Sequence, residues 1–247
     1  MIDIKSSHEL ELIAEAGKVV RIILGELRHK ARPGMLTSEL GRTAEQLIEK
    51  FNARSAFKGY RGFPGVICTS VNEQVVHGIP GKARLLEGDI LSIDVGIEKS
   101  GYFADGAVTI PIGENIPERV LNLIKVTEKA LYLGIEKAVE GNRLFDISYA
   151  VQNIAESNGY SVVRDFVGHG IGKSLHEDPE IPNFGKSGTG PRLAKGMTLA
   201  IEPMINEGGY EVEILEDGWT AVTKDRKLSS HFEHTVAVSD GEARILT

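Results

Sequence analysis

The 247-residue chain is 41% hydrophobic and 26% charged, which excludes a disordered, collagen-like or disulfide-scaffold protein. Its 28 Lys and Arg residues against 35 Asp and Glu residues give a formal charge of -7, so we expect no sequence-specific nucleic-acid partner. The apolar runs are far shorter than the roughly 20 residues of a membrane span, and the first residues do not resemble a signal peptide. A single cysteine, Cys68, rules out an internal disulfide. We therefore expect a cytoplasmic protein with no membrane partner.

Four helices are predicted from apolar residues that recur at helical spacing. The first begins at Ser6, which forms a capping-box pattern with Glu9, and it stops at Pro33-Gly34. A second starts near Thr37 and reaches Phe51. The third and fourth are expected over residues 117–141, opened by Pro117, and over residues 146–159, with Asp146 as the N-cap.

Strands are predicted between and after these helix pairs, over residues 65–109 and 161–247. Within the first region apolar residues at 91, 93, 95 and 97 alternate with small or polar ones, which indicates a half-buried strand. The order helix, helix, strands thus occurs twice, and a shift of 108 aligns residues 88–94 with 196–202. We interpret the chain as one domain, residues 1–247, built from a duplicated αβ unit with repeats at about 6–112 and 117–247, whose strands merge into one sheet.

The first repeat contains a pair of acids at suggestive positions. Asp94 and Asp105 are equidistant from Lys99-Ser100, so a hairpin that turns there places them directly opposite each other. Two unit charges 4 Å apart repel by about 4 kcal/mol at an effective dielectric of 20. A protein tolerates such a pair when a proton or a cation lies between the acids.

The second repeat contains a matching pair. Glu202 and Glu233 have their midpoint at Asp217-Gly218, a strong hairpin dipeptide, although Gly208-Gly209 argues against an unbroken hairpin. If the two pairs converge across a pseudo-twofold axis, four carboxylates imply two divalent ions. A lone Asp pair on a strand is often a surface pair or a misjudged register, but the repetition favours a metal site.

Histidines supply the remaining polar groups. His169 follows an apolar strand between two glycines that allow close backbone approach, and it is the candidate nitrogen ligand. His77 and His176 are candidates for unligated groups in the same cleft, whereas Cys68 is expected to be a small buried hydrophobe rather than a nucleophile. Surface or supporting positions are expected for His8, His29, His231 and His234.

Several short motifs, in a fixed order along nearly the whole chain, carry a family resemblance. They are Cys68-Thr69-Ser70-Val71-Asn72-Glu73, His77-Gly78-Ile79-Pro80, Ile93-Asp94-Val95, Asp105, Gly168-His169-Gly170-Ile171-Gly172, Leu175-His176-Glu177, Ile201-Glu202-Pro203 and Phe232-Glu233-His234-Thr235. In these motifs the sequence resembles the type I methionine aminopeptidases. The resemblance implies the pita-bread fold, an α+β architecture in which a pseudo-twofold duplicated αβ unit forms a central curved antiparallel sheet flanked by helices.

The resemblance also implies an activity: removal of the initiator methionine from nascent proteins and Met-peptides when the second residue is small, by hydroxide attack at a dinuclear divalent-metal site. The two ions would be Co, Mn, Fe or Zn. Asp105 and Glu233 would bridge them, Asp94 would chelate one, and His169 and Glu202 would hold the other. The further roles implied are proton transfer for Glu202, stabilisation of the developing alkoxide for His176, peptide orientation for His77, and a methionine pocket lined by Phe57, Tyr60, Phe63, Cys68, Leu175 and Trp219.

Departures from the family pattern occur at Phe57, Phe63 and Leu175, which bear on the shape of the pocket. Two other functions stay open: an Xaa-Pro peptidase of the same fold, and a non-catalytic module that binds peptides or proteins. The missing extra N-terminal domain argues against the first, and the intact ligands and histidines argue against the second. We further expect a monomer that meets its substrates at the ribosome exit region.

Overall fold

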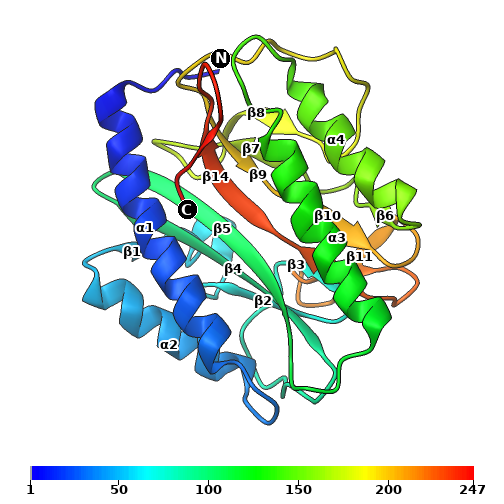
Figure 1. The fold of residues 1–247 in the computed structure, drawn as a ribbon. Coiled ribbons are helices and arrows are strands. Elements are labelled where there is room, and N and C mark those ends of the chain that lie inside the picture. The colour runs from blue at the N-terminus through cyan, green and yellow to red at the C-terminus, as the bar shows by residue number, and fades with distance from the viewer. Residues whose placement is uncertain (1) are drawn as a thin grey trace.

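Four α-helices cover one face of an antiparallel sheet in the computed structural model, which describes residues 2–247 (Figure 1). Helices α1 and α3 cross the sheet side by side, α1 over strands β4 and β5 and α3 over β9 and β14. None of the helices in residues 2–247 has the length and apolarity needed to cross a membrane. The helices are α1 (Ser7–Lys30), α2 (Thr37–Lys50), α3 (Glu118–Ile135) and α4 (Leu144–Ser157), with a short 3-10 turn η1 (Tyr60–Gly62).

The main sheet has nine strands in the order β1-β4-β5-β14-β9-β7-β8, with β2 paired to β4 and β15 to β14. Its strands are β1 (Arg54–Ser55), β2 (Cys68–Val71), β4 (Ile90–Lys99), β5 (Tyr102–Pro111), β7 (Gly168–Gly170), β8 (Glu177–Ile181), β9 (Thr198–Ile201), β14 (Glu233–Ala237) and β15 (Arg244–Ile245). Two three-stranded sheets adjoin it, β13-β10-β6 and β11-β12-β3. They consist of β3 (Gln74–Val76), β6 (Ser161–Val162), β10 (Met204–Asn206), β11 (Val212–Ile214), β12 (Ala221–Thr223) and β13 (Ser229–His231). This mixed architecture confirms the predicted α+β fold class.

The capping signals at the start of the chain act as predicted. The Ser6 hydroxyl accepts a hydrogen bond from the Glu9 N–H, and the Glu9 carboxylate accepts one from the Ser6 N–H, so both halves of the capping box are present. At α4 the prediction was wrong by one turn. The helix begins at Leu144, and Asp146 occupies the third helical position, where its carboxylate accepts the Arg143 N–H at 2.8 Å.

Helix α3 also ends earlier than predicted, at Ile135 rather than at Gly141. The reason is tertiary. The N–H groups of Glu140 and Gly141 donate to the carbonyls of Ser239 and Leu193, at 2.8 and 3.0 Å, instead of to carbonyls one turn earlier in the helix. Hydrogen bonds to other segments therefore replace the last predicted turns.

Strand β4 divides the buried core from the opposite face of the sheet. Its residues Leu91, Ile93, Val95 and Ile97 are fully buried and pack in one cluster with apolar side chains of α1. Because side chains alternate along a strand, Asp94 projects from the other face. The predicted alternation is confirmed, and it leaves the face away from the helices free for polar groups.

The β4–β5 hairpin turns one residue later than the acid spacing suggested. Strand pairing places Asp94 opposite Ala107 and Asp105 opposite Gly96, so the prediction of directly opposed acids was wrong. The turn consists of Ser100-Gly101, both with positive φ, at 55° and 80°. A two-residue type I′ hairpin turn, whose twist matches that of the strands, needs positive φ at both central residues, and Ser100-Gly101 meets this requirement.

The second acid pair lies on a long folded-back arm. The pairs Ile201–His234, Met204–His231 and Val212–Thr223 come from three separate strand ladders, yet all are centred between Asp217 and Gly218. The three ladders therefore share one hairpin register, although the strands between them are interrupted, for example at Gly208-Gly209. Its continuation beyond the Ile201–His234 pair brings Glu202 and Glu233 to facing positions.

Two glycine substitutions are expected to change stability in opposite directions. Gly25 lies exposed within α1, and an added Cβ there would meet only open space, so Gly25→Ala should raise the free energy of unfolding by about 0.5–1 kcal/mol. Gly101→Ala should lower it by about 1 kcal/mol, because a Cβ is unfavourable at a φ of 80°. Urea unfolding of both variants checks the pair, and a stabilising Gly101→Ala would contradict the observed turn.

Candidate functional site

One cavity of about 160 Å³ collects the residues that the sequence singled out. Its lining combines the metal-ligand candidates with aromatic and aliphatic side chains. The structure thus brings together residues from several strands and loops. The lining consists of Phe57, Tyr60, Arg61, Phe63, Cys68, His77, Asp94, Asp105, His169, Leu175, His176, Glu202, Trp219 and Glu233.

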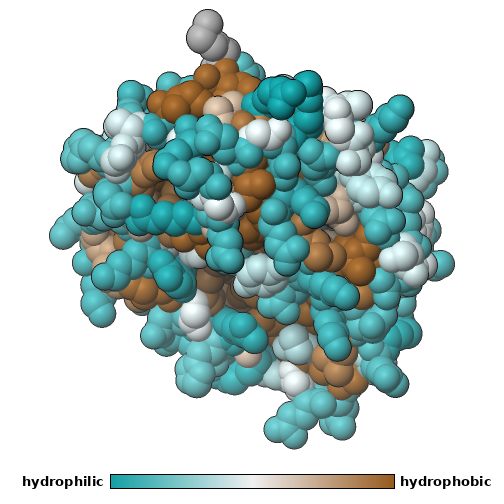
Figure 2. All heavy atoms as spheres, turned by 45° about the horizontal axis from the view of Figure 1, so that its top comes forward, coloured by the Kyte–Doolittle hydropathy of each residue, from teal (hydrophilic) through white to brown (hydrophobic). Residues whose placement is uncertain are grey.

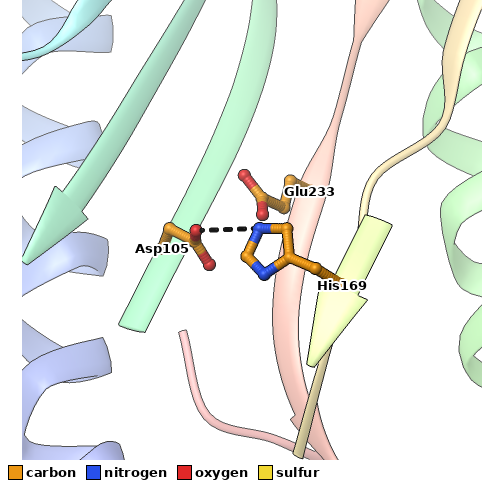
Figure 3. A group of neighbouring side chains, drawn as sticks. All are labelled: Asp105, His169 and Glu233. Atoms are coloured by element: carbon orange, nitrogen blue, oxygen red, sulfur yellow. Dashed lines mark ion pairs between the residues drawn. The ribbon is translucent and has the colours of Figure 1, made fainter. Parts of the chain in front are cut away.

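Five adjacent strands each supply one ligand candidate. In the spatial order β4, β5, β14, β9 and β7, these are Asp94, Asp105, Glu233, Glu202 directly after its strand, and His169. Figure 3 shows the side chains from β5, β14 and β7 directed toward one another. One ligand atom from each of these three lies within 4.8 Å of the others, a spacing that one metal ion can span.

The imidazole of His169 points a lone pair at the acids. Its Nδ1 lies 2.9 Å from the Gly170 carbonyl, which can only accept, so Nδ1 carries the proton. Its Nε2 lies 3.6 Å from Asp105 Oδ2 and 3.5 Å from Glu202 Oε1 (Figure 3 draws the first of these). A backbone acceptor that fixes the tautomer in this way is typical of metal-binding histidines.

Close packing holds the His169 strand in place. A Cβ at position 168 would come within 2.4 Å of the Ala200 carbonyl oxygen, and one at position 170 within 2.1 Å of the Asp178 carbonyl oxygen. Glycine is therefore required on both sides of His169, as predicted.

Burial and mutual repulsion make the acids hard to ionise. Burial raises the pKa values of Asp94, Glu202 and Glu233 well above their ordinary range, and the charge of Asp105 raises them further. The pKa of Asp105 is raised to about 6, again mainly by burial. Burial lowers the pKa of His169 to about 4, so this imidazole is neutral at pH 7.

These properties match the requirements of a divalent cation. Asp94 Oδ1 is buried and has no hydrogen-bond partner, so an acceptor is left over that a cation would satisfy. A neutral imidazole with several clustered carboxylates is a donor set that accepts first-row divalent metals. A cation would also offset the repulsion that raises the carboxyl pKa values.

Two residues next to the acids were not named as site residues from the sequence, although a supporting position was left open for His231. The Thr235 hydroxyl accepts the Asp105 N–H at 3.0 Å and lies within hydrogen-bond distance of the Asp105 carbonyl and Oδ1. His231 is 2% exposed, and its Nε2 lies 3.7 Å from Glu202 Oε2. Of the two positions expected for His231, the structure shows the supporting one. The signal for Thr235 in the sequence was its place in the motif Phe232-Glu233-His234-Thr235.

Two further histidines line the same cavity. His176 Nδ1 lies 2.9 Å from the Tyr60 hydroxyl, and its ring centroid is 4.2 Å from that of His169. Burial, and then the neighbouring His169, lowers the pKa of His176 to about 4, so it too is neutral at pH 7. His77 adopts a positive φ of 62° and packs edge-on against Phe166 at 5.4 Å.

Much of the remaining cavity lining is apolar. Phe63 and Trp219 meet edge to face at 5.2 Å. Phe57 lies over Gly96, where any Cβ would come within 2.4 Å of its ring. Cys68 is buried, and burial raises the pKa of its thiol, which agrees with a packing role rather than a nucleophilic one.

Arg61 is the cavity residue that the sequence analysis missed. It belongs to η1, has a φ of 49°, and its guanidinium lies 5.4 Å from the centre of the Tyr60 ring. No motif marked it, because it is an exposed residue in an irregular segment.

The sequence is closely similar to proteins of known family. Residues 11–240 match metallopeptidase family M24. The chain is 53% identical to a methionine aminopeptidase of Clostridium perfringens, over 100% of this chain and 99% of the relative. It is 49% identical to methionine aminopeptidase 1 of Bacillus subtilis, with the same coverage.

Solved structures agree with this relationship. A crystal structure of methionine aminopeptidase from Thermotoga maritima superposes with a TM-score of 0.98 at 47% identity, covering 100% of this chain and 99% of the other. A prolidase from Pyrococcus furiosus shares the fold with a TM-score of 0.79 at 21% identity, and the chain covers 65% of its length. The pita-bread fold expected from the motifs is thereby confirmed, and the chain belongs to metallopeptidase family M24.

Proposed function

We propose that the protein is a methionine aminopeptidase that removes N-terminal methionine from peptides and nascent proteins when the second residue is small. The observation that supports this most is that one cavity combines the five-ligand set with an apolar recess. Its relatives with 53% and 49% identity carry the same activity in their names. Family membership in M24 already makes the protein a metal-dependent peptidase.

The proposed cofactors are two divalent ions, Co, Mn, Fe or Zn, with the identity set by availability. Asp105 and Glu233 would contact both, Asp94 would hold one, and His169 and Glu202 would hold the other. Ions bound there would supply a strongly nucleophilic water and polarise the scissile carbonyl. The free N-terminal amine of the substrate would bind beside them, which explains a requirement for an unblocked N-terminus.

The side chains around the acids would handle protons and orientation. Glu202, whose Oε2 lies near the neutral His231, is suited to carry a proton from the attacking water to the leaving amine. His176 would donate a hydrogen bond from Nε2 to the oxygen on which negative charge develops, provided that the Tyr60 hydroxyl donates to Nδ1. His77 would orient the peptide bond and the following residue.

Specificity would follow from the apolar and polar parts of the cavity lining. Methionine is long, unbranched and polarisable, so the recess at Tyr60, Phe63, Cys68 and Trp219 would enclose its side chain. Beyond the scissile bond the peptide must pass between the cleft histidines, which leaves room only for a small second residue.

The cellular setting follows from this substrate. We propose a monomer that acts in the cytoplasm on nascent chains near the ribosome exit region. We propose further that residues 1–247 form one catalytic domain whose halves, about 6–112 and 117–247, arose by duplication. The same order of two helices followed by ligand-bearing strands in each half supports the second proposal.

Peptide hydrolysis tests the function. Met-Gly-Met-Met should be cleaved, Met-Leu and Met-Lys peptides should resist cleavage by at least about a hundredfold in kcat/KM, and a chelator should abolish the activity. Cleavage of Ala-Pro peptides instead would indicate an Xaa-Pro peptidase. Binding of Met-peptides with no hydrolysis under any metal would indicate a non-catalytic module.

Glu233→Gln should have opposite effects on stability and metal binding. The raised pKa of Glu233 means that the metal-free fold loses stability as the pH rises above 4.5, so at pH 8 the variant should be more stable without metal by at least about 1 kcal/mol. It should also bind metal at least about tenfold more weakly, because a charged ligand is lost. Chelator-treated melting curves and metal titrations measure both. The exposed Glu216→Gln variant should change neither, and an unaltered metal affinity in Glu233→Gln would contradict the ligand assignment.

Substitutions of the two neighbouring histidines, His169 and His176, should have different effects on metal binding and on turnover. His169→Ala should lose metal, whereas His176→Ala should retain it and lose about 10²–10³-fold in kcat, as expected for a donor used only in the transition state. Metal analysis and steady-state kinetics on both variants decide the point. A metal-free His176→Ala protein would mean that the assigned roles are wrong.

A further inference from the structure

The loop between β7 and β8 carries two cavity residues, Leu175 and His176. The ring of His176 lies between His169 on the adjacent strand and Tyr60 on another segment, and its hydrogen-bond contact is with the Tyr60 hydroxyl. The place of this ring in the cavity therefore depends on how the β7–β8 loop is held.

Glu177, the residue directly after His176, holds the loop in shape. Its Oε1 accepts hydrogen bonds from the backbone N–H groups of Lys173, at 2.7 Å, and Ser174, at 3.1 Å. Its Oε2 accepts one from Lys5 Nζ at 2.6 Å. A single carboxylate thus closes the loop and links it to the segment that precedes α1.

Lys5 is a buried cation in a space kept free for it. Its side chain is 1% exposed, and its ammonium pairs with Asp3 as well as Glu177. A Cβ at Gly172 would come within 2.2 Å of Lys5 Cε, and one at Gly196 within 2.8 Å of the Lys5 carbonyl oxygen. The Lys5 N–H in turn donates to the Gly196 carbonyl at 2.8 Å. Burying an ammonium is unfavourable unless it is paired, so this contact differs in kind from a surface ion pair.

From these contacts we propose that Lys5 is a positioning residue, which acts through Glu177 to hold His176 against the substrate site. The proposal rests on the function proposed above for His176. Without the ammonium, Glu177 loses its buried partner, the loop keeps only its internal hydrogen bonds, and the His176 ring is free to leave Tyr60. Misplacement of a catalytic group by about 1 Å lowers rates by up to about a hundredfold.

The same loop offers a matched control. Lys173 forms an ion pair with Glu9 at 2.8 Å, but its side chain is 59% exposed. Exposed pairs of this kind contribute little to structure. Lys173→Met therefore removes a lysine and an ion pair from the loop without touching the buried contact.

Ring contacts in the metal-free protein test the positioning directly. The nuclear Overhauser effect between the Tyr60 and His176 rings should weaken at least about twofold in Lys5→Met and should persist in Lys173→Met. Unchanged ring contacts in a folded Lys5→Met protein would overturn the proposal. If Lys5→Met does not fold, Glu177→Gln, which keeps an acceptor for the loop N–H groups and loses the charge, takes its place with the same expected result.

Kinetics on Met-Gly-Met-Met separate positioning from general destabilisation. Lys5→Met should lower kcat by about tenfold or more and change KM less than about twofold, while in a His176→Ala background it should lower kcat no further. An equal loss in both backgrounds would show that Lys5 does not act through His176. A fully active His176→Ala enzyme would instead overturn the proposed function of that histidine. The proposal that Lys5 acts on catalysis through His176 would then also be wrong, even if the ring contacts changed in Lys5→Met.

Discussion

Four carboxylates converge in a space from which water is largely excluded, and their mutual repulsion constrains the rest of the structure. Burial alone raises the pKa values of Asp94, Glu202 and Glu233, and the charge of Asp105 raises them further. Such a cluster costs several kcal/mol unless protons or cations compensate it. The protein must therefore have enough stability elsewhere to keep these groups together.

The sheet and its helices supply that stability. Four ligand candidates lie on different strands of a continuous run of five, and Glu202 directly follows the remaining strand, β9, so the hydrogen bonds of the main sheet fix their relative positions. All four helices cover the opposite face, where they bury the apolar side chains of the same strands (Figure 1). The side of the molecule drawn in Figure 2 is mostly hydrophilic, with several hydrophobic areas between the hydrophilic side chains. One face of the sheet thus stabilises the fold, and the other is free to hold charges.

Loops supply most of the apolar lining of the cavity. Phe57, Tyr60 and Phe63 come from the segment around η1, and Leu175 comes from the β7–β8 loop. The departures from the family pattern are all among these residues, so they change the apolar lining of the cavity, and none of them is a ligand candidate. The buried contact of Lys5 also acts on a loop of the cavity, because its partner Glu177 binds the backbone of the β7–β8 loop.

The sequence by itself determined the capped start of α1, the alternation of β4, and the acids among the ligand candidates, because a local capping motif, short-range periodicity and a repeated acid pattern carry that information. Tertiary structure decided the rest. The turn at Ser100-Gly101 shifted the register that acid spacing had suggested, and carbonyls from distant segments ended α3 before Gly141. The contacts of His231 with Glu202 and of Lys5 with the loop join residues far apart in the chain. Such contacts leave no periodic trace in the sequence, since they depend on how separate strands and loops meet in space.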